Sequence, residues 1–125
     1  MAKRILVVDD DKNLVKVLKV TLSKAGYRVL IAYDGEQAIK RIERVTPDLA
    51  ILDVMMPRMD GIELARYLLT FGGSHRIPII FLSVKSSQEE VRRGYRAGAD
   101  WYLGKPFNKE ELLTAVAALL IPGYK

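Results

Sequence analysis

The chain contains no cysteine among its 125 residues. Disulfide bonds and thiolate metal sites are therefore excluded, and nothing in the composition indicates secretion. Long apolar stretches are also missing: none approaches the roughly 18 residues that a membrane-spanning helix needs. The start of the chain, residues 1–4 with Lys3 and Arg4, leads into only a short apolar run, residues 5–8. These absences favour a cytoplasmic protein with no membrane contact.

The sequence also lacks a dense run of positive charge. Lysine and arginine together number 20 against 15 acidic residues, which gives a net charge of +5. An excess of positive charge can indicate an anionic partner. Here the cations are scattered as single or paired residues with no aromatic residues interleaved, so the pattern predicts no direct nucleic-acid binding. No G-x-G-x-x-G follows the first apolar run, which disfavours a dinucleotide-binding domain.

Five short apolar runs alternate with five amphipathic segments along the chain. The runs cover residues 5–8, 29–32, 49–52, 77–82 and 101–103. Such runs are typical of strands buried on both faces, and their alternation with helices predicts a parallel sheet with helices on both sides. We therefore expect one α/β domain over residues 1–125, a flavodoxin-like, doubly wound sheet in the order 2-1-3-4-5.

The predicted helices begin at capping residues. Asp11, Asp34, Asp60 and Asn108 each precede an amphipathic segment, and Ser86 or Ser87 can cap the fourth helix. The last helix is expected to end near residue 120. Helical spacing predicts that the following residues face the core: Leu14, Val17, Leu18, Leu22, Ala25, Ala38, Ile39, Ile42, Ile62, Ala65, Leu68, Leu69, Val91, Tyr95, Leu112, Leu113, Val116, Leu119 and Leu120.

Four of the five predicted strands end on a candidate functional group. The first ends on Asp9 and Asp10, the third on Asp53, the fourth on Ser83 and the fifth on Lys105. Open α/β sheets bind their ligands at this edge, and the second strand is peripheral in the order 2-1-3-4-5. Like charges about 4 Å apart repel by roughly 4 kcal/mol at an effective dielectric near 20. The aspartates therefore predict a counter-charge, for which a divalent cation is the obvious candidate.

These strand ends, together with segments 53–61 and 100–107, resemble the receiver domain of two-component response regulators, and the resemblance covers essentially the whole chain. It implies that Asp53 accepts a phosphoryl group from the phosphohistidine of a sensor histidine kinase or phosphotransfer protein, or from a small acyl phosphate. It further implies that Asp10, Asp53 and the backbone carbonyl of Met55 bind Mg²⁺ directly, and that Asp9 reaches the ion through water.

The resemblance assigns roles to three further residues. Lys105 offsets the negative charge of the carboxylates and of the incoming phosphoryl group. Ser83 donates a hydrogen bond to a phosphoryl oxygen, and Tyr102 then changes rotamer, so that the fourth helix, the fifth strand and the last helix form an output surface. The Lys105–Pro106 bond is expected to be cis. A receiver of this kind catalyses only its own phosphorylation and dephosphorylation.

Two residues depart from the family pattern. Val84 stands where alanine or glycine is usual and could narrow the entry for the phosphoryl group. Trp101 replaces a small polar residue and is either a core residue or an exposed aromatic anchor for a partner. Arg92, Arg93, Arg96 and Trp101 suggest a dimer surface, so the chain is expected to be a monomer or a phosphorylation-dependent dimer.

Two other functions remain open from the sequence. A phosphohydrolase of the haloacid dehalogenase type also uses an aspartate nucleophile with Mg²⁺, but it requires a second aspartate at the position of Met55. A phosphorylation-independent interaction module would predict no response to Mg²⁺. The cognate kinase, the downstream effector, the lifetime of the phosphorylated state and the presence of further domains in a longer protein are not determined by these residues.

Overall fold

The computed structural model describes residues 2–56, 60–71, 76–84, 88–96 and 98–121. Five parallel strands form one sheet in the order β2-β1-β3-β4-β5, which confirms the predicted topology. The strands are β1 (Arg4–Val8), β2 (Arg28–Ala32), β3 (Leu49–Asp53), β4 (Ile79–Ser83) and β5 (Trp101–Gly104). The helices are α1 (Lys12–Lys24), α2 (Gly35–Arg44), α3 (Gly61–Phe71), α4 (Gln88–Arg96) and α5 (Lys109–Leu119).

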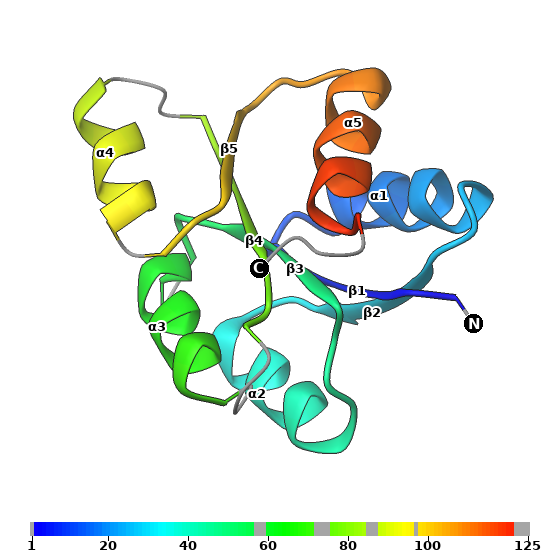
Figure 1. Ribbon diagram of the computed structural model, residues 1–125, viewed down its shortest axis with the longest axis horizontal. Coiled ribbons are helices and arrows are strands. Elements are labelled where there is room, and N and C mark those ends of the chain that lie inside the picture. Colours follow the sequence, from blue (N-terminus) through cyan, green and yellow to red (C-terminus); the bar gives the residue numbers. More distant parts are fainter. Residues whose placement is uncertain (1, 57–59, 72–75, 85–87, 97, 122–125) are drawn as a thin grey trace.

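Helices cover both faces of the sheet. Helices α1 and α5 lie side by side on one face, and α2, α3 and α4 lie on the other (Figure 1). Successive strand side chains point to opposite faces, so Leu6 and Leu52 join one apolar cluster while Val7 and Ile51 join the other. The two central strands β3 and β4 are buried over their whole length, as their uninterrupted apolar sequences predict.

The predicted caps are present wherever the structure describes them. The carboxylates of Asp11, Asp34 and Asp60 accept backbone N–H groups of the first helical turns, and Asn108 forms a complete capping box with Glu111. Asp34 and Gln37 have the spacing of a capping box, but the Gln37 side chain accepts the N–H of Tyr33 and not that of Asp34. The second helix is thereby tied to the end of β2.

Two residues predicted to face the core are exposed: Val17 is 60% exposed and Leu69 is 40% exposed, although the adjacent Leu18 and Leu68 are buried. Val15 and Leu64, which were not predicted to face the core, are buried as well. Adjacent helical residues differ by only about 100° in direction, so a sequence pattern with several apolar neighbours does not choose between them. Ala25 and Tyr95 are also exposed, contrary to expectation.

Element boundaries differ slightly from those predicted. Asp53 is the last residue of β3 and not the first beyond it, and β4 begins at Ile79, two residues later than expected. The caps predicted at Ser86 and Ser87 lie outside the described residues. The Lys105–Pro106 bond is cis, as the resemblance implied. No helix in the described part of the chain combines the length and hydropathy needed to cross a bilayer.

Candidate functional site

Three carboxylates meet at the carboxyl end of the sheet. Asp9 follows β1 and Asp53 ends β3, and these strands are direct neighbours in the sheet, with Val8 paired to Leu52. Asp10 stands beside Asp9 and is exposed, whereas Asp9 is wholly buried and Asp53 is 5% exposed. One oxygen from each of the three carboxylates lies within 4.8 Å of the others. The sequence placed these groups at one edge, and the structure brings them into a single cluster.

Protein donors occupy both carboxylate oxygens of Asp9. Oδ1 accepts the backbone N–H of Asp11 at 3.0 Å, and Oδ2 accepts a hydrogen bond from Lys105 Nζ at 2.9 Å. A carboxylate that is fully removed from water needs such partners, because an unpaired buried charge is strongly destabilising. Asp9 is therefore held in a fixed orientation by the start of α1 and by the residue after β5.

Lys105 links the buried carboxylate to the candidate phosphoacceptor. Its ammonium nitrogen also lies 3.6 Å from Asp53 Oδ1, and its own backbone N–H donates to the carbonyl of Ser83 at 2.7 Å. Burial acts to lower the pKa of Lys105. The hydrogen bond to Asp9 and the charges of Asp53 and Asp9 outweigh burial and raise this pKa above its ordinary value. The lysine thus stays charged between the two aspartates.

Asp53 has an environment that disfavours its charge. Burial and the nearby charge of Asp9 raise its pKa to about 6, against the opposing effects of Lys105 and of the Met55 N–H, which donates to Oδ1 at 3.3 Å. A cluster with three carboxylates and one ammonium group retains excess negative charge. The cluster therefore has the electrostatics of a site that gains stability from an added cation.

The donor set fits Mg²⁺. The three carboxylates supply the hard oxygen ligands that this ion prefers, and Asp10 faces solvent, so bound water can complete the coordination. Since both oxygens of Asp9 are already engaged by protein donors, Asp10 and Asp53 are better placed as direct ligands. Met55 is 54% exposed, and its backbone N–H turns back onto Asp53.

Ser83 and Tyr102 lie on adjoining strands behind the carboxylates. Ser83 is fully buried and pairs with Gly104, while Phe81 pairs with Tyr102 two residues earlier. Tyr102 is half-buried, and its ring packs against the cluster on the α2, α3 and α4 side. The β4–β5 pair therefore connects Ser83, on the strand next to Asp53, with Tyr102, which lies against Gly94 of α4.

Two glycines allow close approaches that the sequence reasoning did not identify. A Cβ at Gly61 would overlap the carbonyl oxygen of Asp53 and lie 3.0 Å from the Val54 Cα. A Cβ at Gly94 would lie 2.9 Å from the Tyr102 ring. In the sequence, Gly61 was noted only as the residue after the capping Asp60 and as the end of segment 53–61, without a reason for glycine at this position. A requirement for glycine imposed by a distant backbone carbonyl leaves no local pattern.

Trp101 is half-buried on the edge strand β5. Trp101 packs against the apolar cluster on the α1 and α5 side, whereas Gly94 of α4 contacts Tyr102 on the opposite face of β5. The period of two along a strand separates residues 101 and 102. Trp101 is thus at least in part a core residue, and the dimer surface suggested by Arg92, Arg93, Arg96 and Trp101 stays a prediction. Val84 is 70% exposed and borders a pocket together with Lys105 and Pro106.

Comparison with known proteins finds the type of domain that the sequence resembles. The family model described as response regulator receiver domain matches residues 5–117. The response regulator MprA of Mycobacterium ulcerans is 48% identical over 120 residues, which are 96% of this chain and 51% of that protein. MprA of Mycobacterium tuberculosis H37Rv shows the same identity and coverage. The chain thus spans about half the length of the curated relatives it matches.

Solved structures agree with the observed fold. The chemotaxis protein CheY4 of Vibrio cholerae has a TM-score of 0.90 and 33% identity, with 96% of this chain and 100% of that chain covered. The DrrB receiver domain, described as BeF3-activated, has a TM-score of 0.88 and 36% identity, with coverage of 96% and 98%. The sequence comparison and the backbone comparison therefore identify the same family.

Proposed function

The chain belongs to the response regulator receiver domain family of phosphorylation-based two-component signalling, and we propose that Asp53 is the residue that accepts the phosphoryl group. The observation that carries this proposal is the placement of Asp53 at the end of a central strand, next to Asp9, Asp10 and Lys105. Asp53 ends a central strand and lies 3.6 Å from Lys105, and the bonds to protein donors involve only its Oδ1. In Asp9, by contrast, both carboxylate oxygens accept hydrogen bonds from the protein.

In the proposed reaction, a carboxylate oxygen of Asp53 attacks the phosphorus atom of a donor phosphohistidine. The new O–P bond forms as the N–P bond breaks, and the imidazole nitrogen keeps the electron pair and takes up a proton. Lys105 stays charged beside Asp53 and offsets negative charge on the phosphoryl oxygens. Its bond to Asp9 fixes the ammonium group in this position before the donor arrives.

Mg²⁺ would be held by Asp10, Asp53 and the backbone carbonyl of Met55, with Asp9 acting through water. When bound, it neutralises carboxylate charge and polarises phosphoryl oxygens. The match between three oxygen donors, excess negative charge and an exposed Asp10 supports this assignment. The raised pKa of Asp53 supports it too, because a nearby cation would favour the ionised form that acts as nucleophile.

We propose that phosphorylation is communicated to the face formed by α4, β5 and α5. A phosphoryl group on Asp53 would accept a hydrogen bond from Ser83, and Tyr102 would then repack against α4. The pairing of Phe81 with Tyr102 and the tight contact of Gly94 with the Tyr102 ring support this route. Such a change is a shift in the populations of two conformations of the domain, one of which is favoured when Asp53 carries a phosphoryl group.

We infer that the upstream partner is a sensor histidine kinase or phosphotransfer protein, and that the domain turns over no separate substrate. The alternative of a haloacid dehalogenase-type phosphohydrolase conflicts with the family match and with Met55 at the required second aspartate. A module that acts without phosphorylation would differ in experiment, because it would gain no phosphoryl group.

The test is incubation with Mg²⁺ and acetyl phosphate followed by intact-mass measurement. The wild type should gain the mass of one phosphoryl group, and Asp53→Ala should gain none. Asp48→Ala is a matched control, since Asp48 precedes β3 at the opposite end of the same strand. Absence of the mass gain in the wild type, or its persistence in Asp53→Ala, would contradict the proposal. Continuous phosphate release from an added phosphomonoester would favour the hydrolase.

A further inference from the structure

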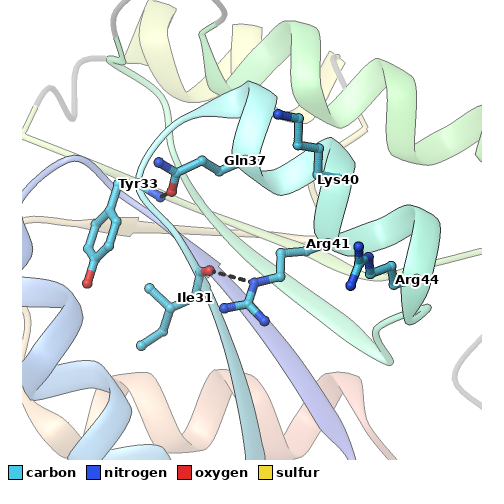
Figure 2. A pocket seen from close by; sticks show the side chains of 6 residues that line it. All are labelled: Ile31, Tyr33, Gln37, Lys40, Arg41 and Arg44. Atoms are coloured by element: carbon cyan, nitrogen blue, oxygen red, sulfur yellow. Dashed lines mark hydrogen bonds between the residues drawn. The ribbon is translucent and has the colours of Figure 1, made fainter.

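A pocket of about 540 Å³ lies between the edge strand β2 and helix α2 (Figure 2). Its lining residues are Ile31, Tyr33, Gln37, Lys40, Arg41 and Arg44. The volume is within the range of roughly 300–1,000 Å³ that is usual for small-molecule sites. None of these lining residues belongs to the cluster of Asp9, Asp10, Asp53 and Lys105.

The pocket carries positive charge that the described part of the chain does not compensate. Three of its six lining residues are cations from α2, and none is a carboxylate. Among the described residues, Lys40 and Arg44 lie within ion-pair distance of no acidic group. Arg41 and Arg44 are three positions apart on one helix, where like charges destabilise the helix. An anion placed between them would relieve this repulsion.

Arg41 is oriented toward the pocket by a bond to the strand. Its Nε donates to the carbonyl of Ile31 at 3.2 Å, and Figure 2 shows the side chain reaching from α2 across to β2. The guanidinium group still has its Nη atoms available as further donors, and their planar arrangement suits phosphate and carboxylate oxygens. The arginine is therefore held in place before a ligand binds.

The same contacts argue against an added strand as the occupant. Arg41 covers the Ile31 carbonyl and Gln37 accepts the Tyr33 N–H, so two backbone groups at this edge of β2 are already paired. Side chains that cover an edge in this way protect it from pairing with another chain. A compact anion can bind to the cations without breaking either bond.

Ordinary structural roles account for only part of this arrangement. Arg41 and Arg44 lie in the last turn of α2, where the helix dipole favours positive charge. That role does not explain Lys40, which precedes the last turn. Glu36 stands four residues before Lys40, a spacing that favours pairing, yet Lys40 forms no ion pair with it. Within the part of the chain that the structure describes, Lys40, Arg44 and the Nη atoms of Arg41 thus remain available to a ligand.

We propose that this pocket binds a small molecule carrying two or more neighbouring negative charges, such as a diphosphate or a polycarboxylate. Lys40, Arg44 and the Nη atoms of Arg41 hold the charged groups, and Ile31 and Tyr33 form the less polar wall. Binding here does not depend on phosphorylation of Asp53, so the proposal stands apart from the proposed function.

The test is titration with pyrophosphate and with citrate in metal-free buffer, followed by amide NMR shifts. Saturable shifts are expected in residues 31–44, and residues 9–11 and 105 report any separate binding at the carboxylate cluster. In the Lys40→Ala/Arg44→Ala variant the affinity should fall roughly tenfold or more, because charge-assisted hydrogen bonds are lost. Arg41 is retained because it covers the strand edge.

The control is Lys16→Ala/Lys24→Ala, which removes the same charge from exposed positions of α1. Its affinity should match that of the wild type, and amide shift dispersion checks that both variants are folded. The proposal is overturned if neither probe causes saturable shifts in residues 31–44, or if the control loses affinity equally. Binding of heparin or duplex DNA without binding of either small anion would also overturn it, in favour of a macromolecular partner.

Discussion

Lys105 Nζ lies 2.9 Å from Oδ2 of the fully buried Asp9. The same nitrogen is 3.6 Å from Asp53 Oδ1, so one ammonium group neutralises a structural carboxylate and contacts the candidate phosphoacceptor. Stability and chemistry are therefore coupled at this residue. Changes to Lys105 affect the folded state as well as the proposed phosphotransfer.

Lys105→Met should destabilise the protein by about 3 kcal/mol, since removing one member of a buried pair leaves an uncompensated charge. The lysine side chain is 18% exposed and Asp9 is not exposed at all. Urea unfolding at neutral pH measures the loss. Adding Asp9→Asn to Lys105→Met should recover part of the stability, because the remaining group is then neutral. No recovery in the double variant would show that the pair is not the source of the loss.

Asp53→Asn should stabilise the metal-free protein at neutral pH. The pKa of Asp53 is raised from its ordinary value of 3.8 to about 6 in the folded state, so the fold retains this proton where the unfolded chain has released it. Stability therefore decreases as the pH rises from about 4 to about 6, and the penalty is complete above that range. The gain in Asp53→Asn should reach roughly 1–3 kcal/mol at pH 7.

This gain should shrink toward zero as the pH falls below about 3.8, where the wild-type carboxyl group becomes protonated in both states. Urea unfolding of the wild type and Asp53→Asn at several pH values gives the difference directly. Other titrating groups are common to both proteins and cancel. A difference that does not change with pH would contradict the assigned pKa shift.

Mg²⁺ should raise the melting temperature of the wild type, because an ion that binds only the folded carboxylate cluster stabilises it by mass action. The gain is about 2.7 kcal/mol at a free ion concentration 100 times the dissociation constant. Removing the ion with a chelator should reverse the shift. Asp10→Asn should weaken the response strongly, whereas Asp48→Asn, at the other end of the sheet, should not. Equal responses in both variants would place the ion elsewhere.

Gly61→Ala should disturb the site through the backbone. The added methyl group would overlap the Asp53 carbonyl oxygen, so the segment between β3 and α3 must shift. We expect a loss of about 2 kcal/mol or more in stability and slower phosphorylation by acetyl phosphate. Gly26→Ala is the control: Gly26 has φ +99 but no atom near its Cβ position. That variant should lose about 1 kcal/mol and keep the wild-type phosphorylation rate.

Val84→Ala should speed phosphorylation by acetyl phosphate a few-fold if the β-branched side chain narrows the entry beside Lys105. Val84 is 70% exposed, so its removal should change the stability by no more than about 0.5 kcal/mol. Phosphoprotein formation over time, followed by intact mass, gives the rate. An unchanged rate would show that Val84 does not restrict access.

Much of the fold was predictable because the strands are short and continuously apolar. Such runs bury on both faces of a parallel sheet, and the alternation with helices leaves few topologies. The buried faces of the helices were less well predicted: Val17 and Leu69 are exposed although the adjacent Leu18 and Leu68 are buried. Adjacent apolar residues on a helix compete for the core, and the packing of the other layers decides between them.

The candidate site was predictable to the extent that its groups lie at strand ends. Asp9, Asp10, Asp53, Ser83 and Lys105 each follow or end an apolar run, and parallel strands bring their carboxyl ends to one edge. The need for glycine at position 61 was not predictable, since it arises from a backbone approach between distant segments. The sequence also left open whether Trp101 is a core residue, which depends on the face of β5 to which its side chain points.

The sequence by itself determined which chemical groups end the strands, and hence the family and the type of site. The tertiary structure alone decided which of those groups are partners. Lys105 and Asp9 are separated by 96 residues and become a buried pair only when β5 and β1 are placed in one sheet. The cationic pocket likewise forms only when α2 packs beside β2. Local patterns fix what a residue offers, whereas distances between remote residues depend on the packing of the whole chain.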